Sequence, residues 1–186
     1  MRAFQSTKLS YFFNLLDIDQ DGHLSVDDFS DLSMKAQNYL GIQDNERAKE
    51  RLAKQGLTFF KRIRSNLELK STTISLMDWL ARFDEILETK DELAIDDIVQ
   101  SFIALIFAIV DENKDGFLSE EEYIQLFTSF NVPLQEAKAA FRTLDRNNDH
   151  RLSRYEILSS IETFISSDDP KESGNWIFGD WRVAEG

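Results

Sequence analysis

The chain has 186 residues, of which 34 are acidic and 21 basic, so its formal net charge is −13 at pH 7. The absence of cysteine excludes a disulfide framework, a thiolate zinc site and a cysteine nucleophile, and the negative charge argues against a general nucleic-acid binder. With 42% hydrophobic residues but only 7 glycines and 2 prolines, the composition favours a mostly helical protein with a substantial core.

Apolar residues recur at the spacing of an amphipathic helix along most of the chain. The segment 101–110 differs because it is apolar on nearly all sides, which predicts a helix buried on most of its surface. The amphipathic sets are, in chain order, Leu9, Phe12, Phe13 and Leu16; Phe59, Phe60 and Ile63; Leu76, Trp79, Leu80, Phe83 and Leu87; Tyr123, Leu126, Phe127 and Phe130; Ala137, Phe141 and Leu144; and Ile157, Leu158, Ile161 and Ile165.

An acidic loop follows the first predicted helix, over residues 17–28. Side-chain oxygens stand at its positions 1, 3, 5, 9 and 12, and a glycine at position 6 permits a sharp turn with positive φ. With a backbone carbonyl from position 7, these oxygens suit calcium, a hard cation that takes six to eight of them. The ligands are Asp17, Asp19, Asp21, Ser25 and Asp28, with Gly22 for the turn and His23 for the carbonyl.

Two further loops, 111–122 and 145–156, repeat this pattern and end in glutamate, which is long enough to bind calcium through both oxygens. In the second of them His150 replaces the turn glycine, and we expect a strain of about 1 kcal/mol that weakens the site without abolishing it. Phe117 and Arg151 supply the backbone carbonyls. The side-chain ligands are Asp111, Asn113, Asp115, Ser119 and Glu122 in one loop, and Asp145, Asn147, Asp149, Ser153 and Glu156 in the other.

A fourth loop is expected between the first two acidic loops, because helix–loop–helix units of this kind stack in pairs. Aligning Ile74 with the apolar position 8 places it at residues 67–78. Its first and third positions are Leu67 and Leu69, which cannot bind a cation, so we predict a metal-free structural partner. The expected contacts between paired loops are Leu24 with Ile74 and Leu118 with Leu152.

These loops resemble those of the EF-hand sarcoplasmic calcium-binding proteins and their relatives, calexcitin and the coelenterate luciferin-binding proteins. The segments 131–133 (NVP), 140–144 (AFRTL) and 174–179 (GNWIFG) also resemble that family. The resemblance covers almost the whole chain. It implies an all-α fold with four EF-hands in two pairs, packed into one compact globule with short β-bridges between paired loops, and a monomer.

The same resemblance divides the chain into three parts. An N-terminal pair of hands occupies residues 1–90, with its second hand degenerate, and a C-terminal pair with two active hands occupies residues 91–167. Residues 168–186 form a linker and an apolar tail that is expected to dock on the core. The apolar residues of the tail are Trp176, Ile177, Phe178, Trp181 and Val183.

The predicted function is that of an intracellular calcium-binding protein that binds three Ca²⁺ and acts as a Ca²⁺/Mg²⁺ buffer. Magnesium should compete most strongly at the first loop, because the short carboxylate of Asp28 makes bidentate capture harder. One alternative is a calcium sensor of the calexcitin type, although three methionines offer little for an adaptable groove. Another is a Ca²⁺-regulated carrier of an apolar small molecule, held among the aromatic side chains.

Enzymatic activity is not expected, because both histidines lie in metal loops and no phosphate-binding glycine-rich loop is present. The first residues lack signal-peptide features and a glycine for myristoylation. The longest apolar run, 102–110, is shorter than the span of about 20 residues that crosses a membrane. We therefore expect a cytoplasmic protein with no membrane span, whose partners are calcium ions and not nucleic acid; the sequence identifies no protein target.

Overall fold

The computed structural model describes residues 1–39, 46–67, 70–111, 115–129 and 132–182. Within these ranges the chain forms helices, four short strands and one 3₁₀ turn, arranged as four helix–loop–helix units. The elements are α1 (Ala3–Leu16), β1 (His23–Leu24), α2 (Val26–Tyr39), α3 (Glu46–Asn66), β2 (Ile74–Ser75), α4 (Leu76–Thr89), α5 (Glu92–Val110), β3 (Phe117–Ser119), α6 (Glu120–Ser129), α7 (Leu134–Leu144), β4 (Arg151–Ser153), α8 (Arg154–Ser166) and η1 (Ser173–Trp176).

Antiparallel β-bridges join the loops two by two. Strand β1 pairs with β2 and places Leu24 opposite Ile74, and β3 pairs with β4 and places Leu118 opposite Leu152. All four side chains are completely buried. The predicted pairing is therefore confirmed in both halves of the molecule, with a buried apolar side chain at position 8 of each loop.

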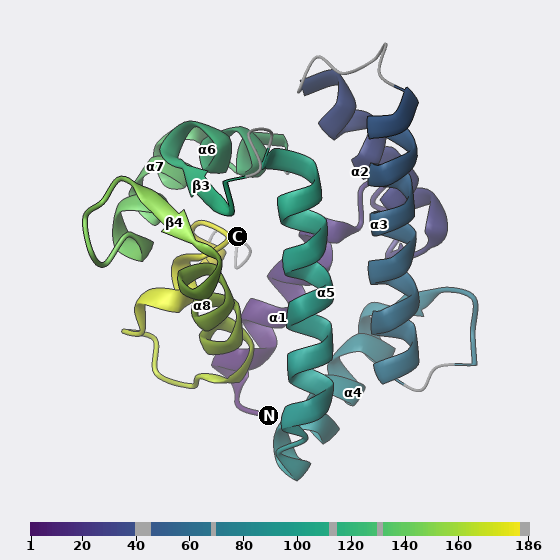
Figure 1. Ribbon diagram of the computed structural model, residues 1–186. Coiled ribbons are helices and arrows are strands. Elements are labelled where there is room, and N and C mark those ends of the chain that lie inside the picture. Colours follow the sequence, from purple (N-terminus) through teal and green to yellow (C-terminus); the bar gives the residue numbers. More distant parts are fainter. Residues whose placement is uncertain (40–45, 68–69, 112–114, 130–131, 183–186) are drawn as a thin grey trace.

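Helix α5 lies in the middle of the molecule, with α3 on one side and α8 on the other (Figure 1). Its length and composition would allow it to cross a membrane, but 56% of its most apolar window is buried inside the fold. The helix begins well before the apolar segment 101–110, because Asp91 caps its first turn by accepting a hydrogen bond from the amide of Ala94. Its apolar character is thus accounted for by burial among the other helices.

The C-terminal tail lies against the core. Ile177 and Phe178 are 1% exposed and Trp181 is 7% exposed. The ring of Phe178 stacks on that of Phe12 with 4.7 Å between centroids and an interplanar angle of 7°. A Cβ on Gly174 would lie 2.6 Å from the Cβ of Thr163, so only glycine fits where the tail meets α8. Val183 lies outside the described residues.

Hydrogen bonds from two tyrosines hold the backbone of the tail. The hydroxyl of Tyr11 donates to the carbonyl of Phe178 at 2.8 Å, and that of Tyr123 donates to the carbonyl of Ile177 at 2.7 Å. Tyr11 belongs to α1 and Tyr123 to α6, so the tail is anchored to both pairs of hands. These bonds also satisfy carbonyl groups that burial would otherwise leave without a partner.

A completely buried lysine makes a further link between α1 and the tail. The ammonium of Lys8 donates to the carbonyl of Ser167 at 2.9 Å and to Oδ1 of Asn175 at 2.6 Å, and it lies 4.5 Å from the centroid of the Phe4 ring. Burial lowers the pKa of Lys8 from 10.5 to about 8, although the negative charge of Asp168 opposes this shift.

Candidate metal centres

The first loop gathers three carboxylates at the end of α1. Oxygens of Asp17, Asp19 and Asp21 all lie within 4.8 Å of one another. Oδ1 of Asp17 is buried and has no hydrogen-bond partner among the described residues. Burial raises the pKa of Asp17, and the charges of Asp28, Asp19 and Asp21 raise it further, against a lowering by the Gly22 amide. A divalent cation bound among these oxygens would give Oδ1 of Asp17 a partner and would offset the repulsion between the three carboxylates.

The backbone of this loop takes the shape that the sequence predicts. Gly22 has φ of +83° and donates its amide to Oδ2 of Asp17 at 3.0 Å. Asp28, which closes the loop, is 1% exposed. Its Oδ1 accepts from the amide of Ile18 at 2.9 Å and its Oδ2 from the amide of Ser25 at 2.7 Å. Both of its oxygens are therefore already engaged by the loop backbone.

The third loop repeats this geometry between α5 and α6. Gly116 has φ of +78° and donates its amide to Oδ2 of Asp111 at 3.3 Å, and Asp115 donates its amide to Oδ1 of Asp111 at 3.1 Å. Phe117 lies at the start of β3, where its amide donates to Oδ1 of Asp115 at 2.9 Å. Asn113, another predicted side-chain ligand of this loop, lies outside the described residues.

The fourth loop adopts the same turn without a glycine. His150 has φ of +63°, as expected for the residue at position 6, and donates its amide to Oδ2 of Asp145 at 3.0 Å. The amide of Asp149 reaches both Oδ1 of Asp145, at 3.2 Å, and Oδ1 of Asn147, at 3.0 Å. Arg151 begins β4 and donates its amide to Oδ1 of Asp149 at 3.1 Å. The histidine thus reproduces the glycine conformation at the cost of strain.

The serines at loop position 9 act as helix caps. The hydroxyl of Ser119 donates to Oε2 of Glu122 at 2.8 Å and accepts from the Glu122 amide at 3.2 Å. Ser153 makes the same pair of contacts with Glu156, at 2.7 and 3.2 Å. Oε2 of each glutamate also accepts from the backbone amide of its serine, at 2.9 Å in both loops, and this reciprocal arrangement is a capping box. It holds each glutamate at its loop and leaves Oε1 with no hydrogen bond from a described residue, so that oxygen is free for a cation.

In the second loop, position 1 is occupied by a buried leucine instead of a carboxylate. Leu67 is completely buried, and its amide continues the helical pattern by donating to the carbonyl of Ile63 at 2.8 Å. Leu69 lies outside the described residues. Asp78, at the closing position, is exposed and serves the α4 cap, where its amide donates to the hydroxyl of Ser75 at 3.2 Å. The described part of this loop holds no group of carboxylates that could bind a cation.

Two features of the sites have only weak sequence signals. Gln20 and Asn148, both at loop position 4, have φ of +61° and +56°. Asparagine commonly adopts this conformation, whereas glutamine does not. Oδ1 of Asp17 lacks a hydrogen-bond partner among the described residues because it is buried, and the loop motif does not specify how deeply this residue is buried.

Comparison with known proteins agrees with this geometry. A model described as "EF hand" matches residues 102–127, and one described as "EF-hand domain pair" matches residues 1–35. The luciferin-binding protein of Renilla reniformis is 25% identical over 183 residues, which cover 96% of this chain and 95% of that protein.

Two solved structures share the fold. The coelenterazine-binding protein from Renilla muelleri, in its calcium-loaded apo form, has a TM-score of 0.76 and 20% identity, with 96% of each chain covered. A sarcoplasmic calcium-binding protein from amphioxus has a TM-score of 0.76 and 17% identity, with 97% of this chain and 98% of the other covered. The arrangement of helices and loops is thus that of calcium-binding globules.

Proposed function

We propose that this chain, an EF-hand calcium-binding protein related to the luciferin-binding and sarcoplasmic calcium-binding proteins, binds three calcium ions and acts as a Ca²⁺/Mg²⁺ buffer. The observation that carries the proposal is a contact common to three loops. In each, the amide at position 6 donates to the aspartate at position 1, from Gly22, Gly116 and His150 at 3.0, 3.3 and 3.0 Å. The loops are therefore folded around the place of the ion.

A buffer role is supported by the closed core. Sensors of the calmodulin type expose a methionine-rich groove when calcium binds. Here Met34 and Met77 are 53% and 79% exposed and belong to different helices, α2 and α4. The tail is anchored to both pairs of hands, which opposes the opening of either pair.

Magnesium competition at the first loop is supported by the contacts of Asp28. Both of its oxygens accept backbone amides, from Ile18 and Ser25. Bidentate capture of calcium would have to compete with these bonds, whereas the six-coordinate geometry of magnesium needs fewer protein oxygens. We therefore assign mixed-metal behaviour to this loop.

Calcium stoichiometry measured by equilibrium dialysis tests the number of sites. We expect three ions per chain, and two in each of the variants Asp17→Asn, Asp111→Asn and Asp145→Asn at calcium concentrations that saturate the other loops. Asp78→Asn makes the same charge change in the second loop and should leave three. A lower stoichiometry in Asp78→Asn, or fewer than three ions in the unaltered chain, would contradict the proposal.

A second candidate function is the carriage of an apolar small molecule. The specific observation is the ring cluster around Phe178, which contacts the rings of Phe12, Phe102, Phe127 and Phe164. The space between the rings of Phe12, Phe102, Phe127 and Phe178 is too narrow for a water molecule. A planar ligand would therefore have to replace the Phe178 ring, and the similarity to a luciferin-binding protein supports a ligand of this kind.

Titration with coelenterazine, the ligand named for the Renilla muelleri relative, tests this candidate. If the chain is a carrier, coelenterazine should quench its tryptophan fluorescence at one molecule per chain, either with calcium bound or without it. Phe178→Ala should bind coelenterazine both with and without calcium, because the ring that fills the space is removed. Absence of binding by the unaltered chain and by Phe178→Ala would reject the carrier function.

The proposal includes a monomeric, cytoplasmic protein without enzymatic activity. The relatives described above carry the names of binding proteins, and α5, the described helix that could cross a membrane by length and composition, is mostly buried. Size-exclusion chromatography with light scattering and cell fractionation test the first two statements.

A further inference from the structure

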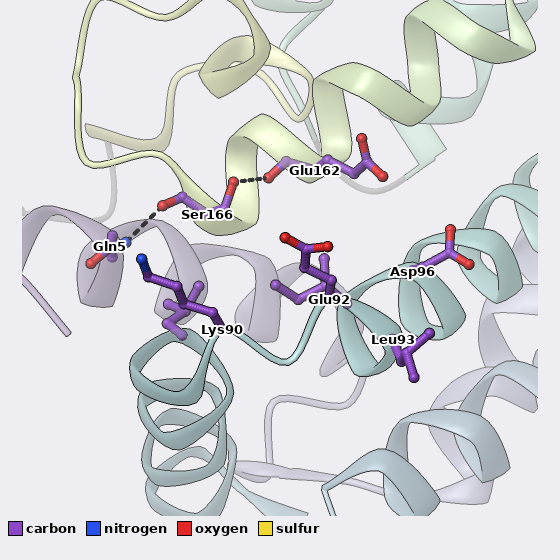
Figure 2. A pocket seen from close by; sticks show the side chains of 9 residues that line it. Gln5, Lys90, Glu92, Leu93, Asp96, Glu162 and Ser166 are labelled. Carbon is purple, nitrogen blue, oxygen red and sulfur yellow. Dashed lines mark hydrogen bonds between the residues drawn. The ribbon is translucent and has the colours of Figure 1, made fainter.

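A pocket of about 690 Å³ opens at the meeting point of four helices, at the ends of these helices that lie away from the loops. Its lining comes from the start of α1, the turn between α4 and α5, and the end of α8 (Figure 2). Gln5 donates its side-chain amide to the carbonyl of Ser166 at 2.8 Å and so ties α1 to α8 beside the opening. We call this space the helix-end pocket. Its volume suits an entire small molecule.

The charge of the helix-end pocket is uncompensated. The carboxylates of Glu92 and Glu162 form no hydrogen bond or ion pair with a described residue, and that of Asp96 accepts only from the neutral amide of Gln100, at 3.3 Å. Lys90 also lines the pocket, and Figure 2 shows its ammonium directed toward Gln5, with Glu162 and Asp96 on the other side of Glu92. Three carboxylates and one ammonium leave an excess of negative charge.

The electrostatics of Glu162 reflect this excess. Burial raises the pKa of its carboxyl, and the nearby charge of Asp96 raises it further. A positive group placed between the two would remove the repulsion and provide the missing partner.

Two observations indicate an organic cation instead of a metal ion. Among the described residues, the group of three acidic side chains that lies close enough to hold a metal is Asp17, Asp19 and Asp21, and the pocket carboxylates do not form such a group. The pocket also has an apolar side, formed by Leu87, Ile95 and Leu93.

We propose that the helix-end pocket binds a small organic amine, with its ammonium among Glu92, Asp96 and Glu162 and its apolar body against Leu87 and Ile95. The site is built from helices that lead to the metal loops. Helix α1 runs from the pocket into the loop that begins at Asp17, α5 runs into the loop at Asp111, and α8 returns from the loop that ends at Glu156. The proposal therefore includes a coupling: a change in helix angles on metal binding would alter the pocket, and calcium would change the affinity for the amine.

Isothermal titration with tryptamine tests the proposal, and tryptophol, in which a hydroxyl replaces the ammonium, is the matched neutral probe. Both titrations use the full chain, once metal-free with EDTA and once saturated with calcium. We expect tryptamine to bind at least about tenfold more tightly than tryptophol, because its ammonium would face three carboxylates at once, and a tenfold difference corresponds to about 1.4 kcal/mol. Equal binding of the two probes, or no binding of either, would overturn the amine site.

Variants of opposite charge sharpen the test. Glu162→Gln and Asp96→Asn should each weaken tryptamine binding by about fivefold, and Lys90→Gln should strengthen it about twofold because it removes the one positive charge. Glu50→Gln, on the exposed surface of α3, makes the same charge change away from the pocket and should have no effect. A loss in Glu50→Gln equal to that in Glu162→Gln would mean attraction to overall charge and would overturn the site.

The coupling between amine binding and calcium binding is tested separately. Calcium should change the affinity for tryptamine, and tryptamine should change the affinity for calcium by the same factor. An affinity for tryptamine that is identical in EDTA and in calcium would overturn the coupling. Because calcium stoichiometry is measured separately by dialysis, failure of the amine site and failure of the three-ion proposal are distinguishable.

Discussion

The two pairs of hands share one architecture but differ in their ligands. In the C-terminal pair both loops keep their aspartates and glutamates, whereas in the N-terminal pair one loop keeps them and the other begins with Leu67, which is completely buried. The β-bridge persists in both pairs. Loop pairing therefore depends on the apolar residue at position 8 and the strand hydrogen bonds, and it does not require a carboxylate at position 1 of each loop.

The loops also differ in how they are closed. Glu122 and Glu156 each use one oxygen for the capping serine, which leaves the other for a cation. Asp28 is shorter and receives a backbone amide on each oxygen. The first loop is thus closed by its own backbone, whereas the third and fourth loops leave part of their closure to the ion.

The largest expected effect comes from restoring a ligand to the second loop. Leu67→Asp should lower the free energy of unfolding by about 4 kcal/mol, because it removes a buried leucine and places an unpaired carboxylate in the core. It should not add a calcium site. Urea unfolding and calcium dialysis check both statements, with the exposed Leu93→Asp as a control within about 0.5 kcal/mol of the unaltered chain. A fourth bound ion in Leu67→Asp would show that the ligand set alone separates the two loops.

The next effect concerns Lys8, where the two pairs meet through the tail. Its pKa of about 8 in the folded protein lies below the ordinary value of 10.5, so the folded state binds fewer protons between these values. Stability should therefore rise by about 1 to 2 kcal/mol as pH increases from about 8 to 9.5. Above about pH 10 it should fall, because burial raises the pKa of Tyr11 to about 12 and that of Tyr123 also lies well above its ordinary range.

Urea unfolding in excess calcium at several pH values measures this dependence. Lys8→Met should remove the rise below pH 10, whereas Lys61→Met, at an exposed position of α3, should keep it. A pH profile that is the same in Lys8→Met and in the unaltered chain would show that another group is responsible.

A reciprocal exchange of the closing residues should move the metal preference of two loops in opposite directions. Asp28→Glu should raise the calcium-over-magnesium ratio of the first loop by about tenfold, and Glu122→Asp should lower that of the third loop by a similar factor. Calcium titrations with and without magnesium give both ratios. If Asp28→Glu left magnesium competition unchanged, the closing carboxylate would not be its cause.

The smallest expected effect concerns the fourth loop. His150→Gly should relieve about 1 kcal/mol of backbone strain and tighten calcium at this loop by up to about fivefold. His150→Ala removes the side chain but keeps a Cβ at positive φ, so it should give no such gain. An equal gain in both variants would point to the imidazole and not to the backbone.

Much of the fold and of the sites could be predicted from local patterns. The spacing of Asp17, Asp111 and Asp145 with their partner ligands gave the loops, and the apolar residue at position 8 gave the pairing, because both depend on residues close together in the chain. The capping role of Ser119 and Ser153 was missed, since a serine oxygen at that position satisfies a ligand pattern and a capping box equally well.

The sequence by itself determined the helix–loop–helix units, the positive φ at His150 and the leucine in place of a carboxylate at the start of the second loop, because each follows from the chemistry of a few neighbouring residues. Only the tertiary structure decided the burial of Lys8 against Asn175, the stacking of Phe178 on Phe12 and the convergence of α1, α4, α5 and α8 on an acidic pocket. The Lys8 and Phe178 contacts each join residues more than 160 positions apart, and the pocket brings α1 and α8 to the turn between α4 and α5. No local pattern specifies which distant side chains will lie together.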